Sequence, residues 1–288
     1  MGVFARAADG RARVVREIRA AAPLMATLRA PVPARGPWLT AVLNGRSWSP
    51  AGAPLGCRPV AVVVEDDRGG RPVAAAFLVL RRGVRRTTVT LLGQASPVQP
   101  DGRPPARLLA RDDAAAELLA AGIVDLLGSL GGAWALELRG LPLGDPTLRC
   151  LAAALPGSVP ANGRSRRLVD ELDALAEPPL RSRDPRVIER WLPELLPRHP
   201  DPAARSLLRA TIRLHAAIDQ LEVALVADDG RPRAALLTLV DGADRWPWWG
   251  FTDVGGLRTE MGAPLVTLTA RGGRRTRNRT DVRAGGRR

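Results

Sequence analysis

The stretch VVVEDDRGGRPVAAAFLVL, Val62 to Leu80, decides how this chain is interpreted. Two apolar runs flank Asp66, Asp67 and two glycines, and this pattern predicts antiparallel strands joined by a tight turn. The same order recurs in VALVADDGRPRAALLTLV, residues 223–240. Five residues repeat at a constant offset of 160 positions (from 70 to 230): Gly70, Arg71, Pro72, Ala74 and Ala75 return as Gly230, Arg231, Pro232, Ala234 and Ala235. The sequence therefore predicts a duplicated strand hairpin.

The bulk composition is that of a globular protein with a strong positive charge. The chain has 288 residues, of which 45% are hydrophobic, enough for one large or two ordinary domains. Its formal net charge is +14, and all 43 basic residues are arginine. Such a charge favours anionic partners, including nucleic acids. However, part of the excess lies in 271–288, and no nucleic-acid-binding motif accompanies it. Nucleic-acid binding is therefore kept only as the least favoured alternative.

The cysteines and the apolar segments predict a reduced, cytoplasmic protein. Cys57 and Cys150 are too far apart in sequence for a metal-ligand motif and too few for a disulfide scaffold. The N-terminal residues are charged throughout and do not resemble a secretory signal. The most apolar window, 118–138, contains Asp125 and Glu137, so no membrane span is expected.

The first part of the chain predicts three strands, then a helix, a strand and a second helix. Residues 1–35 are interpreted as a basic helix (11–29) followed by a Pro-rich link that ends it. The first half proper is expected over 36–163. It opens with a short helix at Pro37, in which Trp38, and then Trp48, are expected to anchor the core. The remaining expected elements are strands at 59–65, 72–80, 87–92 and 133–138, and helices at 111–130 and near 145–154.

The second part repeats this order less completely. Residues 164–183 are expected to be a linker, with a helix considered for LVDELDALA (168–176). The second half is placed at 184–270, with helices at 184–196 and 203–220, the hairpin copy, and strands at 246–252 and 263–269. Beyond Ala270 a further helix and strands would be expected, and the arginine-rich 271–288 is interpreted as a disordered tail. The predicted fold class is therefore α+β, a mixed sheet flanked by helices in two related halves, the second incomplete.

Few residue types with catalytic chemistry are present. The chain has two histidines, His199 in a Pro-flanked loop and His215 in an amphipathic helix, both interpreted as surface or packing residues. No serine or cysteine lies in a nucleophile motif, and no phosphate-binding glycine loop follows a strand. The paired aspartates at 66–67 and 228–229 precede glycines and are interpreted as turn residues, so no metal site is predicted.

The segment Trp246 to Phe251, WPWWGF, concentrates aromatic residues in a chain that has only 3% of them. At strand spacing Trp246 and Trp248 share one face, and Trp249 and Phe251 share the other. One face is expected to enter the core. The other could line a groove for an acyl or aromatic ligand.

The two hairpins EDDRGGRPVAAAFLVL (65–80) and ADDGRPRAALLTLV (227–240), each preceded by helices and followed by a strand, resemble the GNAT acyltransferase superfamily. The resemblance is to its tandem-domain branch, which includes Fem-type and cellulose-biosynthesis acetyltransferase-like proteins, and it spans about 37–270. It implies acetyl-CoA or another acyl-CoA as co-substrate, or aminoacyl-tRNA in the Fem branch. The donor would lie where a central strand splays from its neighbour, with its pyrophosphate at a helix N-terminus. An amine or hydroxyl acceptor, on a small molecule or a peptide, would attack the acyl group, with a carboxylate or water as base.

The sequence departs from that family at the cofactor loop. The pattern of Gln or Arg followed by spaced glycines after the fourth strand is missing from both halves. Two functions therefore stay open, an acyl-CoA-dependent acyltransferase and a noncatalytic binding protein that retains the sheet. From position and residue type, the sequence predicts Trp248, Trp249 and Asp253 as acceptor-binding residues and Glu260 as a remote candidate base. It predicts no cofactor-binding residue.

Overall fold

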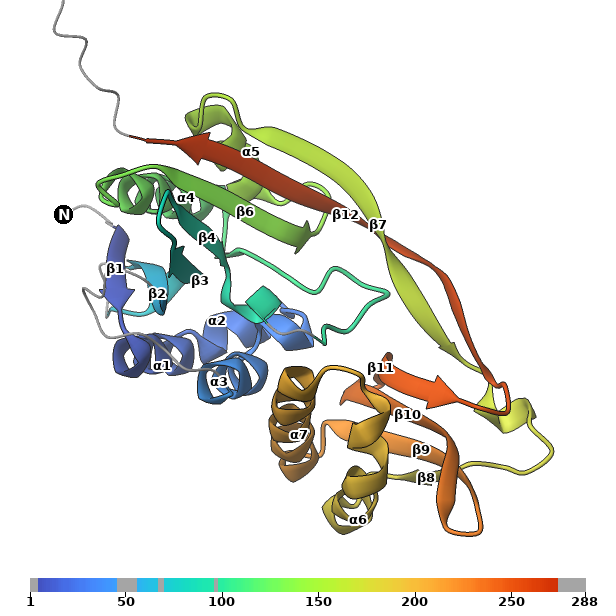
Figure 1. Ribbon diagram of the computed structural model, residues 1–288. Coiled ribbons are helices and arrows are strands. Elements are labelled where there is room, and N and C mark those ends of the chain that lie inside the picture. Colours follow the sequence, from blue (N-terminus) through green and yellow to red (C-terminus); the bar gives the residue numbers. More distant parts are fainter. Residues whose placement is uncertain (1–4, 46–55, 67–69, 96–97, 274–288) are drawn as a thin grey trace, which may run out of the picture.

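The computed structural model describes residues 5–45, 56–66, 70–95 and 98–273, and it confirms the predicted mixed α+β class. Two sheets are present in this part of the chain, one with eight strands and one with four (Figure 1). Helices cover both faces of the first sheet and one face of the second. Trp48, predicted to anchor the core, and 274–288 of the predicted tail lie outside the described residues.

The first sheet has the order β1-β2-β3-β4-β6-β12-β7, with β5 beside β3. Its neighbouring strands are antiparallel except for β4 and β6, the one parallel pair in the described part of the sheet. The strands are β1 (Ala5–Asp9), β2 (Gly56–Glu65), β3 (Pro72–Arg82), β4 (Thr87–Leu91), β5 (Leu109–Ala110), β6 (Trp134–Leu141), β7 (Val159–Asp170) and β12 (Leu257–Gly272).

Both copies of the repeat form the predicted hairpins. In the first, β2 and β3 pair antiparallel, and the amide of Asp66 donates to the carbonyl of Arg71 at 3.1 Å. In the second, Asp229 and Gly230 have φ of 48° and 75° and form a tight turn between two paired strands. These left-handed angles explain why Asp and Gly occur there. Asp67 lies outside the described residues.

The second sheet has the order β11-β10-β9-β8 and carries its helices on one face. Asp184 and Asp201 cap the two helices through their carboxylates, and a proline follows each cap at the first helical position. The elements are β8 (Leu180–Ser182), α6 (Pro185–Leu195), α7 (Pro202–Ala217), β9 (Leu221–Asp228), β10 (Arg231–Asp241) and β11 (Asp244–Thr252).

The last strand returns to the first sheet, which differs from the predicted organisation. β12 lies between β6 and β7 and pairs with β7 from Leu257 opposite Asp170 to Thr269 opposite Val159. The sequence placed 257–270 in the second half and interpreted 164–183 as a linker with a candidate helix. In the structure, 164–170 belong to β7, followed by a 3-10 turn at Leu172–Ala174. The second sheet is therefore inserted between two adjacent strands of the first, and Figure 1 shows β7 and β12 running side by side toward it.

The N-terminal segment also joins the first sheet. β1 pairs antiparallel with β2, from Ala5 opposite Val64 to Asp9 opposite Val60. The sequence assigned 1–35 to a helix and a link and did not predict this strand, since ARAAD has no β-branched or aromatic residue. The predicted basic helix is divided into α1 (Arg11–Ala20) and α2 (Ala22–Thr27), and α3 (Gly36–Asn44) follows a 3-10 turn at Val32–Ala34.

One apolar core joins the two sheets. It contains residues of β2 and β3, of α1 and α3, and of α7, β10 and β11. At its centre Trp38, predicted as a core anchor, is 0% exposed, and its ring meets those of His215 and Trp248 edge-on, with centroids 5.9 and 5.3 Å away. On the opposite face of the first sheet α4 (Asp113–Gly128) and α5 (Pro146–Ala154) cover a second cluster.

Candidate functional site

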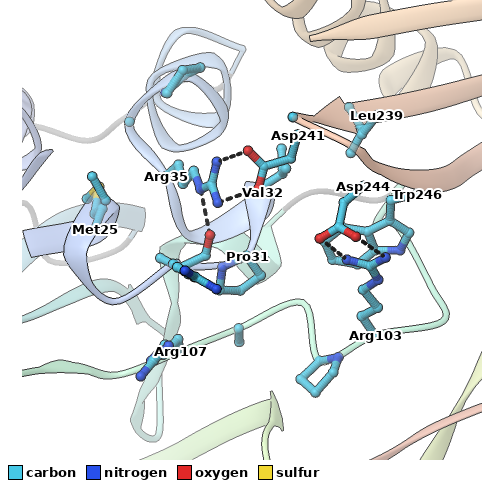
Figure 2. Close-up of a pocket in the computed structure, with 18 of the residues that line it drawn as sticks. Met25, Pro31, Val32, Arg35, Arg103, Arg107, Leu239, Asp241, Asp244 and Trp246 are labelled. Carbon is cyan, nitrogen blue, oxygen red and sulfur yellow. Dashed lines mark hydrogen bonds and ion pairs between the residues drawn. The ribbon is translucent and has the colours of Figure 1, made fainter.

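From here on, the part of the chain built on the eight-stranded sheet, with α1 to α5, is called the first half, and the part built on the four-stranded sheet, with α6 and α7, the second half. A cavity of about 790 Å³ lies between them, and this volume is within the roughly 300–1,000 Å³ that ligand pockets occupy. The first half contributes α2, the turn before α3 and the loop that carries Arg103 and Arg107. The second half contributes the end of β10, the following turn and the start of β11. Figure 2 shows these elements around the cavity. Much of its wall is apolar and includes Met25, Val32 and Leu239.

Two ion pairs cross from one half to the other at the edge of this cavity. Arg35 donates to both carboxylate oxygens of Asp241 at 2.7 and 2.6 Å, and its Nε donates to the carbonyl of Ala30 at 2.5 Å. The guanidinium of Arg35 lowers the pKa of the Asp241 carboxyl. Arg103 binds Asp244 at 3.2 and 3.5 Å (Figure 2). All three donor groups of Arg35 are therefore already engaged.

The turn between β10 and β11 presents both carboxylates. Asp241, the last residue of β10, lies opposite Asp244, the first residue of β11, and Gly242 between them has a φ of 60°. Trp246 follows on β11 and lines the cavity, with Arg103 above its ring at 5.8 Å from the centroid. The indole N–H of Trp246 donates to the carbonyl of Asp101, so this wall of the cavity is anchored to the first half.

The wall of the cavity carries more positive than negative charge. Four arginines and two aspartates line it, which gives a formal net charge of +2. The two aspartates are paired with Arg35 and Arg103. Among the described residues, no carboxylate forms an ion pair with Arg29 or Arg107. Arg107 donates to the carbonyl of Leu28, and its charge acts on the buried carboxyl of Asp145. Two arginines are therefore left to meet an anion.

A second, smaller cavity of about 210 Å³ adjoins the first. Its lining includes Arg167 and Arg245, and it shares Arg103 and Trp246 with the larger cavity. Arg245 is bound to Glu222. Burial alone would raise the pKa of the Glu222 carboxyl, but Arg245 and Arg181 lower this pKa overall. Arg103, which lies over the ring of Trp246, therefore borders both the larger, mainly apolar cavity and the smaller, polar one.

The wedge between β4 and β6 is where the family resemblance places an acyl donor, and protein atoms occupy it. The β4–β6 ladder ends at Thr90 opposite Glu137. Beyond it, the side-chain amide of Gln94 binds both backbone groups of Arg139, and the amide of Ala106 donates to the carbonyl of Gly140 at 3.2 Å. The backbone groups that would face a ligand there are already paired within the chain.

The helix N-terminus beside this wedge does not favour a pyrophosphate. Asp112 caps α4 by accepting from the amide of Ala115 at 2.8 Å, and Asp113 adds a second carboxylate in the first turn. The hydrogen bond from Ala115 and the neighbouring Arg111 lower the pKa of Asp112, so its charge persists at neutral pH. Two carboxylates at this position repel the phosphates that helix amides otherwise attract.

The second half does not provide an equivalent wedge in its described residues. There β11 is an edge strand that pairs only with β10, and the chain continues directly into β12. The residues of neither half therefore fit acyl-CoA in the position that the resemblance implies.

Of the predicted site residues, Trp249 and Asp253 both meet the Arg198–His199 segment, whereas Trp248 and Glu260 lie elsewhere, and none lines the two cavities described above. Trp248 is 5% exposed, and its indole N–H donates to the carbonyl of Val98 at 3.3 Å. Trp249 lies opposite Leu237 and is half-buried against the same core as Trp246 and Trp248, because the bulge cancels the predicted alternation of faces. Asp253 beyond the strand is bound to Arg198 at 3.0 Å. Glu260 is on β12, paired with Arg258. Their acceptor-binding and catalytic roles stay predictions.

The structure adds Trp246 and the arginines of the cavity, which the sequence did not single out as ligand contacts. Trp246 belonged to the predicted aromatic cluster but was interpreted with Trp248 as one strand face. A bulge opposite Leu237 and Thr238 interrupts the strand between them. Both indoles belong to the core cluster, and Trp246 also lines the cavity. The local sequence had no signal for Arg35 or Arg107, because in this chain arginine is common everywhere.

Other chemistry in the described residues is sparse. They contain no group of three or more His, Cys, Asp or Glu side chains placed to hold a metal ion. Cys57 and Cys150 are free thiols, and burial raises the pKa of Cys150. None of the helices in the described ranges is both long and apolar enough to cross a membrane.

Comparisons with known proteins add a structural likeness. No protein-family model and no curated protein matches the chain. Among solved structures, a tandem GNAT protein from the clavulanic acid biosynthesis pathway, determined without AcCoA, is similar over 93% of this chain and 98% of that chain. The sequence identity is 14% and the TM-score 0.40. At these values the function of this chain is argued from its own residues.

Proposed function

We propose that this protein is a noncatalytic small-molecule-binding protein whose ligand occupies the cavity between the two halves. The supporting observation is the cavity itself, which is large, has an apolar wall, and is bordered by the Arg35–Asp241 and Arg103–Asp244 ion pairs. Its two carboxylates are each engaged by an arginine, and Arg35 lowers the pKa of Asp241, which makes that carboxylate a weaker base. Binding is therefore the chemistry that these residues support.

The test is calorimetric titration with two small amphiphiles, decanoate and 1-decanol, and a variant that fills the cavity. Ala26 lines the cavity from α2 and its side chain is exposed, so Ala26→Trp is expected to fold and to occupy the space. We expect at least one probe to bind the unmodified chain with 1:1 stoichiometry, and Ala26→Trp to weaken that binding about tenfold or more.

The matched control is Ala153→Trp, an exposed alanine on α5 that lines neither cavity. It should leave the affinity unchanged. If neither probe binds, or if Ala26→Trp binds as well as the control, the cavity is not the binding site and the proposal fails.

Acyl-CoA-dependent acyl transfer to an amine or hydroxyl, on a small molecule or peptide, is the second candidate. It is favoured by the parallel β4–β6 pair at the middle of the first sheet, the arrangement that the GNAT resemblance implies. It would require Gln94 and the segment around Ala106 to leave the wedge. When bound, the thioester would supply the activated acyl group, and this chain would have to bind and orient it.

Acetyl-CoA separates the two candidates, because a ligand that binds only the folded protein must raise its unfolding temperature. The binding-protein proposal predicts no change in Tm at millimolar acetyl-CoA. A saturable rise in Tm, accompanied by transfer of the acetyl group to an added amine, would instead establish the second candidate.

A further inference from the structure

The charges around the cavity between the halves indicate which class of ligand it accepts. Its wall carries four arginines and two aspartates, and each aspartate is bound to one arginine. The Arg35–Asp241 pair uses both carboxylate oxygens and both terminal nitrogens of Arg35, and Nε of Arg35 donates to the carbonyl of Ala30. The uncompensated charge therefore lies on Arg29 and Arg107.

These two arginines lie at one end of the cavity. Arg107 donates to the carbonyl of Leu28, the residue that precedes Arg29, at the C-terminal end of α2. Arg29 has a φ of 47°, which ends the helix and turns the chain there. Figure 2 shows Arg107 well separated from Arg103 and Trp246 at the other end. Neither Arg29 nor Arg107 forms an ion pair with a carboxylate among the described residues, and the charge of Arg107 also acts on the buried carboxyl of Asp145.

Apolar side chains lie between these two ends. Met25 and Val32 are on the helical side, Leu239 on the side of β10, and the ring of Trp246 closes the far end. A ligand complementary to this wall has an apolar body and an anionic group at one end. Guanidinium groups bind such oxyanions through paired N–H donors, and carboxylate and phosphate share the geometry that suits them.

We propose that the cavity binds amphiphilic oxyanions, molecules with an apolar body that ends in a carboxylate or phosphate, and that Arg107 and Arg29 hold the anionic group. This inference rests on the proposed binding function and adds the ligand class and the residues that select it. The apolar body lies along Met25, Val32 and Leu239 toward Trp246.

The experiment compares three probes of equal chain length, decanoate, decyl phosphate and 1-decanol, by calorimetric titration of the full chain. We expect both anions to bind at least about tenfold more tightly than decanol, since hydrogen bonds to charged groups are the strong ones. The ratio of the two anions identifies the head group. Equal affinity for decanol and the anions would overturn the inference while leaving the proposed binding function intact, and binding of no probe would remove both.

Variants of the two arginines locate the anion. Arg107→Met and Arg29→Met should each weaken decanoate binding about tenfold and change decanol binding less than about threefold. Arg29 has an exposed side chain, so its variant keeps the test valid if Arg107→Met does not fold. Arg186→Met, an exposed arginine at the start of α6 that lines neither cavity, is the matched control and should change nothing. Unchanged anion preference in both cavity variants would refute the assignment.

Discussion

Single residues in the core decide how the two halves meet. Trp38 on α3 touches His215 on α7 and Trp248 on β11, so one indole links the first half to two elements of the second. Trp248 was predicted from position and residue type to contact an acceptor, yet its burial and its bond to Val98 explain its presence as packing. The half-buried pair Trp249 and Phe251, whose ring centroids are 6.0 Å apart, is the part of the cluster that solvent reaches.

His215 makes stability depend on pH. Its ring is buried, Nδ1 donates to the carbonyl of Thr211 at 2.8 Å, and Nε2 has no hydrogen-bond partner. Burial lowers its pKa, and the bond to Thr211 opposes this only in part. The imidazole of His215 therefore becomes protonated near pH 6.5 in the unfolded chain, whereas in the folded chain it stays neutral to lower pH. We expect His215 to have no effect on the free energy of unfolding above pH 6.5. Below pH 6.5 this free energy decreases as the pH is lowered, by about 1.4 kcal/mol in total for each unit by which folding lowers the pKa of His215.

Denaturant titrations between pH 7.5 and pH 5 measure this effect. His215→Leu should flatten the dependence in that interval, because the titrating group is gone. Ile212→Val, a smaller change at a buried residue of the same helix that removes no titrating group, should leave it unchanged. A steep dependence that survives in His215→Leu would assign the proton to another group.

At the scale of elements, the wedge between β4 and β6 is the feature that separates the two functional candidates. β6 is bound on that edge by the side chain of Gln94 and by the segment around Ala106, so no backbone group there is left for a ligand. Gly140 permits this close approach. Its φ is +66°, and a Cβ at that position would meet Pro105 Cγ at 3.0 Å.

Gly140→Ala is expected to destabilise the fold more than Gly144→Ala does. Both glycines have positive φ, and each alanine carries a backbone cost of about 1–2 kcal/mol. Only Gly140→Ala also pushes against Pro105, which adds about 1 kcal/mol or more, since a Cβ at Gly144 meets nothing within 4 Å. Chemical denaturation measures the difference. Equal losses in the two variants would mean that the Pro105 segment does not lie on β6, and the wedge would then be open to an acyl donor.

For the whole molecule, the insertion of the second sheet between β7 and β12 makes the two halves one folding unit. The core runs from β2 and β3 through α1 and α3 to α7 and β10, without a polar boundary. The ion pairs Arg35–Asp241 and Arg103–Asp244 then link the halves at the edge of the cavity. The candidate ligand site therefore exists only when both halves are folded and docked.

A double-mutant cycle of Arg35→Ala and Asp241→Ala measures how strongly the halves are coupled at the cavity. The pair is bidentate and half-exposed, so we expect a coupling free energy of about 1 kcal/mol, below that of a buried pair. The comparison pair Arg213 and Glu189 lies within the second half on an exposed surface and should couple less. No measurable coupling between Arg35 and Asp241 would show that they do not hold the halves together.

The sequence by itself determined the duplicated hairpin, because turn chemistry at Gly70, Asp229 and Gly230 and the apolar runs beside them are local. It also determined most helices and the mixed α+β class, through the period of apolar residues and the Asp-Pro caps. Only the tertiary structure decided that β12 pairs with β6 and β7, since the apolar pattern of one strand does not specify which other strand it pairs with. The cavity was likewise decided there: its arginines and Trp246 come from segments up to about 200 residues apart, and no local pattern brings Arg35 to Asp241.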